Sequence, residues 1–252
     1  MSPDTRQHRG AHPADKQLFS DEHLPSLRDA IADLSLLLTR GYSLKSSLKL
    51  VGDRYNLKER QRLAVWRAAC SDSQLEHRRG NCVPIDKIRG ESLVIDGFNL
   101  LITIEAALSG GLLIVGRDEC FRDLSGVHGS YRSVVETEQA ICLVGRAFEA
   151  IGVKKARWFL DKPISNSGRL ADRIRHLSAE RSWPWEVELA FNPDAEILSS
   201  AHIAVSSDSV ILDRATSWVD LNSHLIGQYL SKSWIVDLRP IRMSAASVRE
   251  ER

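Results

Sequence analysis

Three apolar runs in the second half of the sequence each end at an aspartate. The runs are LVID (93–96), WFLD (158–161) and IAVSSD (203–208), and a fourth aspartate, Asp194, closely follows the alternating run WEVELAF (185–191). A short apolar run bounded by turn residues is typical of a buried strand in a parallel sheet. Because the carboxyl ends of parallel strands meet at one edge, we expect Asp96, Asp161, Asp194 and Asp208 to lie close together.

Four converging carboxylates would repel one another, since no matching cluster of Lys or Arg accompanies them. A hard divalent cation such as Mg²⁺ or Mn²⁺ relieves that repulsion by taking oxygen ligands. Such an ion lowers the pKa of a bound water molecule and stabilises the charge that develops on a phosphodiester. An alternative stays open for each residue, because an aspartate after a strand is also a common turn former or helix N-cap.

Neighbouring polar residues could assist such a site. Asn99 either orients a metal-bound water or caps the helix that follows it. Ser165 and Ser167 precede an expected helix, whose first backbone N–H groups could hold a phosphate. A nucleophilic role for these serines is disfavoured, because no His or Lys is paired with them in a recognisable arrangement.

The elements that must position these residues alternate between strands and helices over residues 91–239. Helical stretches are expected at 133–151, 169–181, 194–200 and 209–216, and SWIVDL (233–238) is expected to be the last strand. This alternation predicts an α/β domain with a parallel sheet. The charged segment 240–252 is expected to be a disordered tail.

A separate helical module is predicted for residues 21–75, with three helices joined by short turns. Asp21 is the expected N-cap of the first helix, and Ser43 opens the second. Asn56 and Glu59 have the spacing of a capping box for the third, whose apolar positions include Trp66. Residues 1–20 are expected to be a disordered lead-in, and the polar residues 76–90 a linker.

Charge is distributed unevenly over the chain of 252 residues. Residues 1–90 carry 16 Lys and Arg against 11 Asp and Glu, whereas residues 91–252 carry 18 against 22. The basic helices could therefore contact phosphates through their arginines, although a solvated helix face is the simpler explanation. The arginines in question are Arg40, Arg54, Arg60, Arg62 and Arg67.

Composition narrows the class of protein. The chain has 43% hydrophobic residues, no apolar run near the ~18–20 residues of a membrane span, and a polar N-terminal stretch without the apolar core of a secretory signal. Its four cysteines form no CxxC pair. We therefore expect a globular protein of the reducing cytoplasm with no membrane partner. The sequence leaves open whether it forms a homo-oligomer.

One motif resembles a known group of nucleases. LVIDGFNLL (93–101) is similar to the first strand of the NYN group of PIN-like nucleases, in which a strand ends in Asp-Gly-Tyr/Phe-Asn, and FLD (159–161), NPDAEI (192–197) and VSSDS (205–209) follow in that group's order. The resemblance covers residues 91 to about 220 and implies a three-layer α/β/α domain with a Mg²⁺-dependent ribonuclease site. It implies that Asp96, Asp194 and Asp208 hold the metal, assisted by Asp161 and Asn99.

The segment 102–132 departs from a minimal NYN domain. Within it, Arg122 could contact substrate or belong to a hydrogen-bonded structural loop.

Most of the chain also resembles a family of archaeal and bacterial proteins. The family is catalogued as domain of unknown function 434 at the front and domain of unknown function 5616 behind, and it carries no established activity. The segments that resemble it include LLLTRGYSLKSSLKLVGDRYNL (36–57), RDLSGVHGSYR (122–132), DKPISNSGRLA (161–171) and SSDSVILD (206–213).

Together these observations predict a metal-dependent ribonuclease that hydrolyses RNA phosphodiesters at the aspartate cluster. Asn99, Ser165, Ser167 and Arg122 are its expected substrate contacts. The alternative is a catalytically inactive RNA-binding or scaffold protein on a PIN-like fold. A phosphatase ranks last, because Asp161-Lys-Pro is not the nucleophilic Asp-x-Asp of aspartyl phosphatases.

Overall fold

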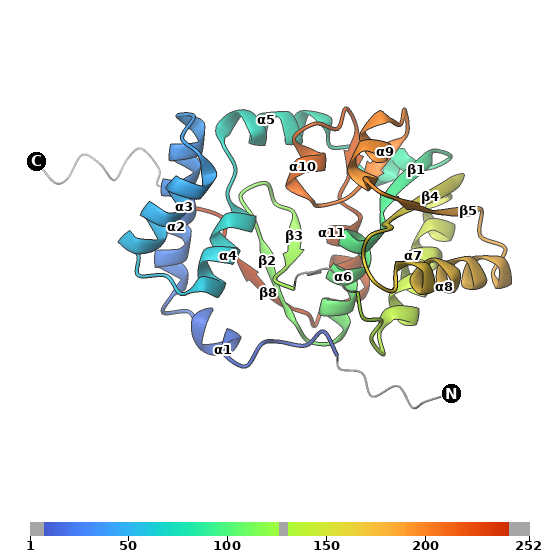
Figure 1. The fold of residues 1–252 in the computed structure, drawn as a ribbon, viewed down its shortest axis with the longest axis horizontal. Helices are drawn as coiled ribbons and strands as arrows, with labels where there is room; N and C mark the ends of the chain where they lie inside the picture. The colour runs from blue at the N-terminus through green and yellow to red at the C-terminus, as the bar shows by residue number, and fades with distance from the viewer. Residues whose placement is uncertain (1–7, 126–130, 242–252) are drawn as a thin grey trace, which may run out of the picture.

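A computed structural model describes residues 8–125 and 131–241. Its larger part is built on a five-stranded parallel sheet of order β5-β4-β1-β6-β7 (Figure 1). This arrangement confirms the predicted α/β class. The strands are β1 (Ser92–Asp96), β4 (Lys155–Asp161), β5 (Trp185–Ala190), β6 (Ile203–Val205) and β7 (Trp218–Val219).

Helices cover both faces of this sheet. On one face, Leu93 and Ile95 of β1 share a core with four helices, whereas Val94 points the other way into a core with two short helices. Alternate side chains of one strand thus enter opposite cores, which gives three layers, α/β/α. The first four helices are α6 (Gly97–Leu108), α7 (Thr137–Ile151), α8 (Ser167–Glu180) and α11 (Leu221–Tyr229), and the short pair is α9 (Pro193–Ser199) and α10 (Ser209–Leu212).

The helical module lies at the other end of the molecule (Figure 1). It contains α2 (Leu24–Thr39), α3 (Leu44–Arg54) and α4 (Glu59–Ala68). Ser43 caps α3 as predicted, its hydroxyl accepting from the Ser46 N–H over 3.4 Å. The other two expected caps differ: His23 and Lys58 occupy those positions, and Asn56 adopts a left-handed conformation with φ 50° in the preceding turn.

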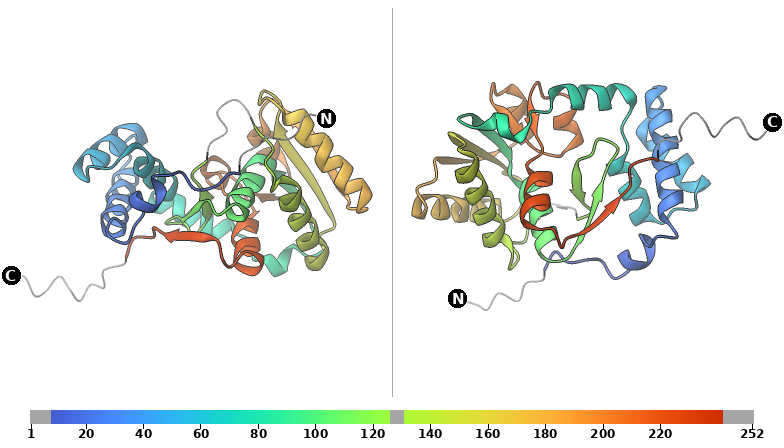
Figure 2. Two further views of the ribbon diagram at one scale, coloured as in Figure 1. Left: turned by 90° about the horizontal axis from the view of Figure 1, so that it is seen from below. Right: turned by 180° about the vertical axis from the view of Figure 1, so that it is seen from behind.

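A second sheet joins the module to the α/β/α layers. Its order is β3-β2-β8, with β2 (Leu112–Val115) antiparallel to β3 (Phe121–Asp123) and parallel to β8 (Trp234–Asp237). Leu112 and Ile114 pack into the core of the helical module, whereas Leu113 packs with Ile226 of α11 on the other side. The expected last strand therefore exists as β8, which runs from α11 toward the helical module (Figure 2).

The segments expected to be irregular contain further structure. Residues 72–81 form α5 (Asp72–Asn81), and η1 (Ile85–Ile88) follows, so residues 76–90 are more than a linker. The start of α5 is a capping box of Ser71 and Gln74, whose Ser-x-x-Gln spacing is visible in the sequence. The expected lead-in includes α1 (Asp15–Leu18) and the buried Phe19. Residues 1–7 and 242–252 lie outside the described residues.

Within residues 8–125 and 131–241, none of the helices combines the length and the apolar character needed to cross a membrane.

Candidate acidic site

The four strand-end aspartates line one cleft, as the sequence predicted. The cleft has a volume of about 370 Å³ and lies at the carboxyl ends of the parallel strands. Asp96 ends β1, Asp161 ends β4, Asp194 lies in the first turn of α9, and Asp208 directly precedes α10. Parallel pairing of the strands brings residues that are far apart in sequence to one edge.

Asp96 has a strongly raised pKa. Its Oδ1 accepts from the Asn99 N–H at the start of α6 (3.3 Å), and its Oδ2 accepts from the Ser206 hydroxyl (2.9 Å). Burial, followed by repulsion from Asp208 and from Asp194, raises the pKa of Asp96 to about 7. A proton or a cation at this carboxylate would relieve the repulsion.

Asp208 is held by the segment that links β6 to α10. It caps α10 by accepting from the Val210 N–H over 2.7 Å, and its own N–H donates to the Ser206 hydroxyl over 3.0 Å. Asn99 supports the same segment, because its Oδ1 accepts from both the N–H (2.8 Å) and the hydroxyl (2.9 Å) of Ser207. The Asn99 side chain thus fixes the approach to Asp208 and does not cap α6.

Asp161 and Asp194 are the other two strand-end aspartates of the cleft. Burial raises the pKa of Asp161. Burial also raises the pKa of Asp194, together with repulsion from Asp208 and Asp161, while the cation Arg214 partly offsets the effect. Burial is the largest cause of the raised pKa at Asp96, Asp161 and Asp194, and repulsion from neighbouring carboxylates adds to it at Asp96 and Asp194.

The structure does not bring Ser165 or Ser167 into the acidic cleft. Ile164 lines it, whereas Ser165 is exposed and uses its backbone carbonyl to accept from the Tyr131 N–H (3.1 Å). Ser167 is buried at the first residue of α8, with its hydroxyl 3.4 Å from the Lys162 carbonyl. Neither serine therefore contributes its hydroxyl to the cleft lining.

Arg122 does line the cleft, but its guanidinium is already engaged. Its Nε donates to the Ser207 carbonyl over 2.8 Å, and its two other nitrogens donate to the Asp118 carboxylate over 2.8 and 2.6 Å. Burial alone would raise the pKa of Asp118, yet Arg122 and Arg78 hold it well below its usual range. Arg122 thus positions the segment before Asp208. Of the two roles expected for Arg122, substrate contact or a structural hydrogen bond, this geometry favours the structural one.

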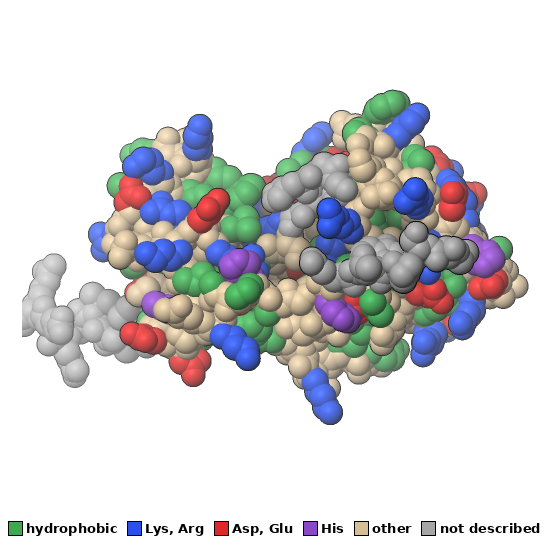
Figure 3. Space-filling model, turned by 60° about the horizontal axis from the view of Figure 1, so that its bottom comes forward, with side chains coloured by type: hydrophobic (Ala, Val, Ile, Leu, Met, Phe, Trp, Pro, Cys, Tyr) green, Lys and Arg blue, Asp and Glu red, His purple; other side chains and the backbone are tan. Residues whose placement is uncertain are grey.

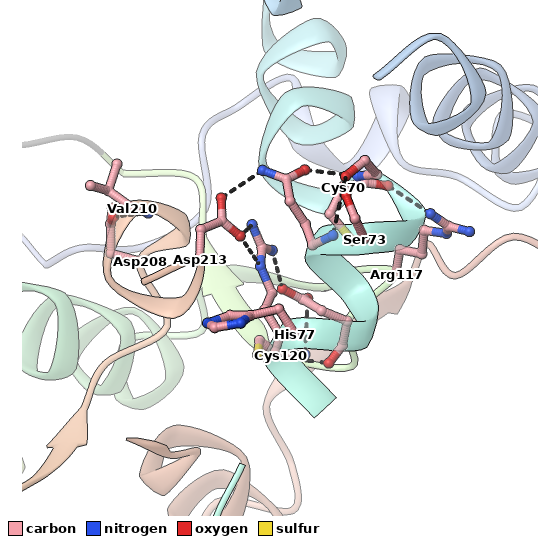
Figure 4. A network of polar contacts seen from close by, with 12 residues as sticks. Cys70, Ser73, His77, Arg117, Cys120, Asp208, Val210 and Asp213 are labelled. Carbon is pink, nitrogen blue, oxygen red and sulfur yellow. Dashed lines mark hydrogen bonds and ion pairs between the residues drawn. The ribbon is translucent and has the colours of Figure 1, made fainter. Parts of the chain in front are cut away.

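Helix α5 anchors the helix that Asp208 caps. Asp213, at the end of α10, accepts from the Gln74 amide (2.6 Å) and from Nε of Arg78 (2.7 Å), and Arg78 also donates to Asp118 (2.6 Å). Figure 4 shows Asp208, Val210 and Asp213 on one side of this network and α5 on the other. The geometry of the acidic cleft therefore depends on a helix that the sequence reading treated as part of a linker.

Two residues of the helical module also line the cleft, and the sequence gave little sign of them. Trp66 and Arg67 of α4 face it, next to Asp123 of β3. The sequence predicts Trp66 as one of the apolar positions of its helix. In the structure it is 47% exposed. Its neighbours Ala64 and Val65 are buried, so the module's core does not need Trp66.

The basic residues of the helical module are largely neutralised. Four of the five arginines form ion pairs inside the chain, with Asp33, Asp15, Asp53 and Asp123 as partners of Arg54, Arg60, Arg62 and Arg67. On the face shown in Figure 3, Lys and Arg are scattered over both parts of the molecule and do not gather into one patch.

The donor set suits a hard cation. It includes carboxylate, hydroxyl and amide oxygens, which are ligands of Mg²⁺ and Mn²⁺. The two arginines of the lining, Arg67 and Arg122, are paired with Asp123 and Asp118. Within the described part of the chain, no three Asp, Glu, His or Cys side chains are already grouped closely enough to enclose an ion. Mg²⁺ retains several water molecules and needs only one or two direct carboxylate ligands, so this geometry remains compatible with it.

Comparisons with known proteins identify the two families that the motifs resembled. "Domain of unknown function (DUF5616)" matches residues 85–224, and "Protein of unknown function (DUF434)" matches residues 26–80. The chain is similar to an uncharacterized protein of Methanocaldococcus jannaschii, with 32% identity over 209 residues that cover 82% of this chain and 99% of the relative. No solved structure matches it. The chain therefore belongs to the family of Domain of unknown function (DUF5616), preceded by the DUF434 segment.

Proposed function

We propose that the protein is a metal-dependent ribonuclease that hydrolyses RNA phosphodiesters at the acidic cleft. The observation that carries the proposal is the convergence of Asp96, Asp161, Asp194 and Asp208 in one cleft, with raised pKa values at the first three. The resemblance of LVIDGFNLL to the first strand of NYN nucleases supports it, as does the three-layer α/β/α architecture.

In this proposal Mg²⁺ or Mn²⁺ would lie among Asp96, Asp194 and Asp208, with one or two of these carboxylates as direct ligands and water molecules between the ion and the rest. The ion supplies charge neutralisation at the phosphodiester and a lowered pKa for the attacking water. Ser206 holds Asp96 in place, and Asn99 and Arg122 fix the segment that leads to Asp208. Asp161, which lies in the same cleft and has no arginine partner among the described residues, holds and orients water beside the ligands.

The test combines metal binding with cleavage. Mn²⁺ is titrated calorimetrically into the wild type and into Asp96→Asn/Asp208→Asn, and both proteins are incubated with labelled single-stranded RNA and Mn²⁺. We expect saturable binding and cleavage in the wild type and the loss of both in the variant. Asp86→Asn/Asp172→Asn is the matched control, because both aspartates are exposed and lie outside the cleft.

Retained cleavage in the Asp96→Asn/Asp208→Asn variant would contradict the proposal. RNA binding without cleavage by the wild type would instead favour a catalytically inactive RNA-binding protein.

A further inference from the structure

An exposed tryptophan stands at the wall of the acidic cleft. Trp66 is the one exposed indole among the chain's six tryptophans, all of which the structure describes. It lines the same cleft as Asp96 and Asp208, although it belongs to α4 of the helical module. What distinguishes it from other exposed aromatic residues, such as Tyr42 and Phe191, is that its ring is available to a ligand in this cleft.

The position of Trp66 is fixed by its neighbours in the sequence. Ala64, Val65 and Ala68 of α4 are buried in the core of the module. Arg67 donates to the backbone carbonyls of Asp123 and Ser125, the second over 2.9 Å, and so attaches α4 to the end of β3. Trp66 is therefore held at the cleft before any ligand arrives, which lowers the entropic cost of binding.

The residues that line the cleft indicate which ligand group would contact the Trp66 ring. Its aspartates suit a phosphodiester with a divalent cation, and its lining also includes the apolar side chains of Ile102, Ile164 and Val210. A strand whose phosphate lies over the aspartates carries flat bases to either side of it. Bases stack on exposed aromatic rings in a way that tolerates any sequence, with about 1–3 kcal/mol per base.

We propose that Trp66 is a stacking platform for an unpaired base of the strand whose phosphodiester lies over the aspartates. The binding site is then shared: the DUF5616 segment supplies the acids, and the DUF434 segment supplies the base contact. This inference rests on the proposed function for the identity of the strand. It adds a specific role for the helical module that its neutralised arginines do not provide.

The test measures binding apart from cleavage. Fluorescein-labelled oligouridine of twelve nucleotides is titrated with protein in Ca²⁺, a hard cation that the carboxylates also accept. A second probe has the same phosphates with abasic sugars throughout. The proteins are the wild type, Trp66→Ala, Trp66→Phe and Tyr42→Ala, the last an aromatic on the same module that is 61% exposed and does not line the cleft.

We expect Trp66→Ala to weaken oligouridine binding about tenfold. Trp66→Phe should retain most of the affinity, and Tyr42→Ala should match the wild type. On the abasic probe, Trp66→Ala and the wild type should bind equally. Because Trp66 is exposed, its variants should keep the wild-type melting temperature, which a thermal scan checks.

The inference is overturned if Trp66→Ala binds oligouridine as the wild type does, if it loses affinity equally for the abasic probe, or if the wild type binds neither probe. These outcomes differ from failure of the proposed function. Trp66-dependent binding without cleavage would remove the nuclease activity and leave the stacking role, whereas cleavage with unchanged Trp66→Ala affinity would do the reverse.

Discussion

Aspartates of this protein occupy two opposite electrostatic environments. Asp118 is buried between Arg78 and Arg122, which hold its pKa well below the usual range despite burial. Burial, with repulsion from Asp208 and Asp194, raises the pKa of Asp96 to about 7. The first arrangement stabilises the ionised carboxylate in the fold, whereas the second leaves a carboxylate that gains from a proton or a cation.

The raised pKa of Asp96 predicts how metal-free stability depends on pH. An unfolded aspartate titrates near pH 4, so between about pH 4 and pH 7 the folded state binds more protons than the unfolded state. Stability contributed by Asp96 is therefore present at low pH and is lost as pH rises toward 7. In EDTA, Asp96→Asn should be more stable than the wild type at pH 7.5 by about 2 kcal/mol, and by much less at pH 4.5.

Urea unfolding at the two pH values measures this difference. Added Mn²⁺ should raise the stability of the wild type at pH 7.5 and leave that of Asp96→Asn nearly unchanged, because a ligand stabilises the state that binds it. Equal stability of the two proteins at both pH values would show that the Asp96 carboxylate is not destabilised in the fold.

Asn99 is predicted to act through Ser207. Its Oδ1 accepts two hydrogen bonds from that residue, so Asn99→Ala leaves the N–H and the hydroxyl of Ser207 without this acceptor. We expect a loss of about 1–3 kcal/mol in unfolding free energy and weaker Mn²⁺ binding, since Asp208 follows Ser207 directly. Denaturant unfolding and calorimetry measure the two effects. Ser165→Ala, at an exposed position outside the cleft, is the control and should change neither.

At the scale of elements, α5 holds α10 in place through the carboxylate of Asp213. Asp213→Ala leaves the buried Arg78 with Asp118 as its remaining carboxylate partner. We expect a loss of about 2 kcal/mol in unfolding free energy. Because Asp208 caps the same short helix, Mn²⁺ affinity should fall as well.

Asp172→Ala is the matched control for this prediction. Asp172 also pairs with an arginine, Arg175, but its side chain is 78% exposed. Its loss should cost at most about 0.5 kcal/mol and leave Mn²⁺ binding intact. If Asp213→Ala changed metal affinity no more than Asp172→Ala, α5 would have no part in positioning Asp208.

The acidic cleft was predictable from the sequence because its signals are local. An apolar run that ends in aspartate reports both a buried strand and the residue at its carboxyl end, as LVID at β1 shows. The two residues of β7 give no comparable signal. The position of Trp66 at the cleft could not be predicted from the sequence either. It depends on the hydrogen bonds by which Arg67 attaches α4 to the end of β3, and these two segments are more than fifty residues apart.

The second sheet was missed for a related reason. WIVD at β8 was recognised as a strand, but its partner β2 precedes it by more than a hundred residues. Strand pairing at that separation is decided by packing of the whole molecule, here by the shared core of Ile114, Val236 and the helices α2 and α4. Local patterns in a single sequence do not predict which distant strands pair.

At the scale of the whole molecule, the helical module and the α/β/α layers are predicted to unfold together. The module's core includes Ile31 and Leu34 of α2 together with Ile114 of β2, so the module does not complete its core without the second sheet. We expect one calorimetric transition with equal calorimetric and van't Hoff enthalpies. Ile31→Ala, a fully buried position, should lower its midpoint by the equivalent of about 2–5 kcal/mol without splitting it. Two separate transitions, one of them insensitive to Ile31→Ala, would contradict this prediction.

The position of strand β8 in the sequence affects how the chain folds during translation. It lies after residue 224, beyond both matched family segments, yet Val236 and Leu238 pack against the first helices of the chain. A ribosome releases those helices long before it has synthesised β8. The apolar face of the helical module therefore stays incomplete until residue 238 has been synthesised, and a nascent chain that stops short of that residue exposes the face to chaperones and proteases.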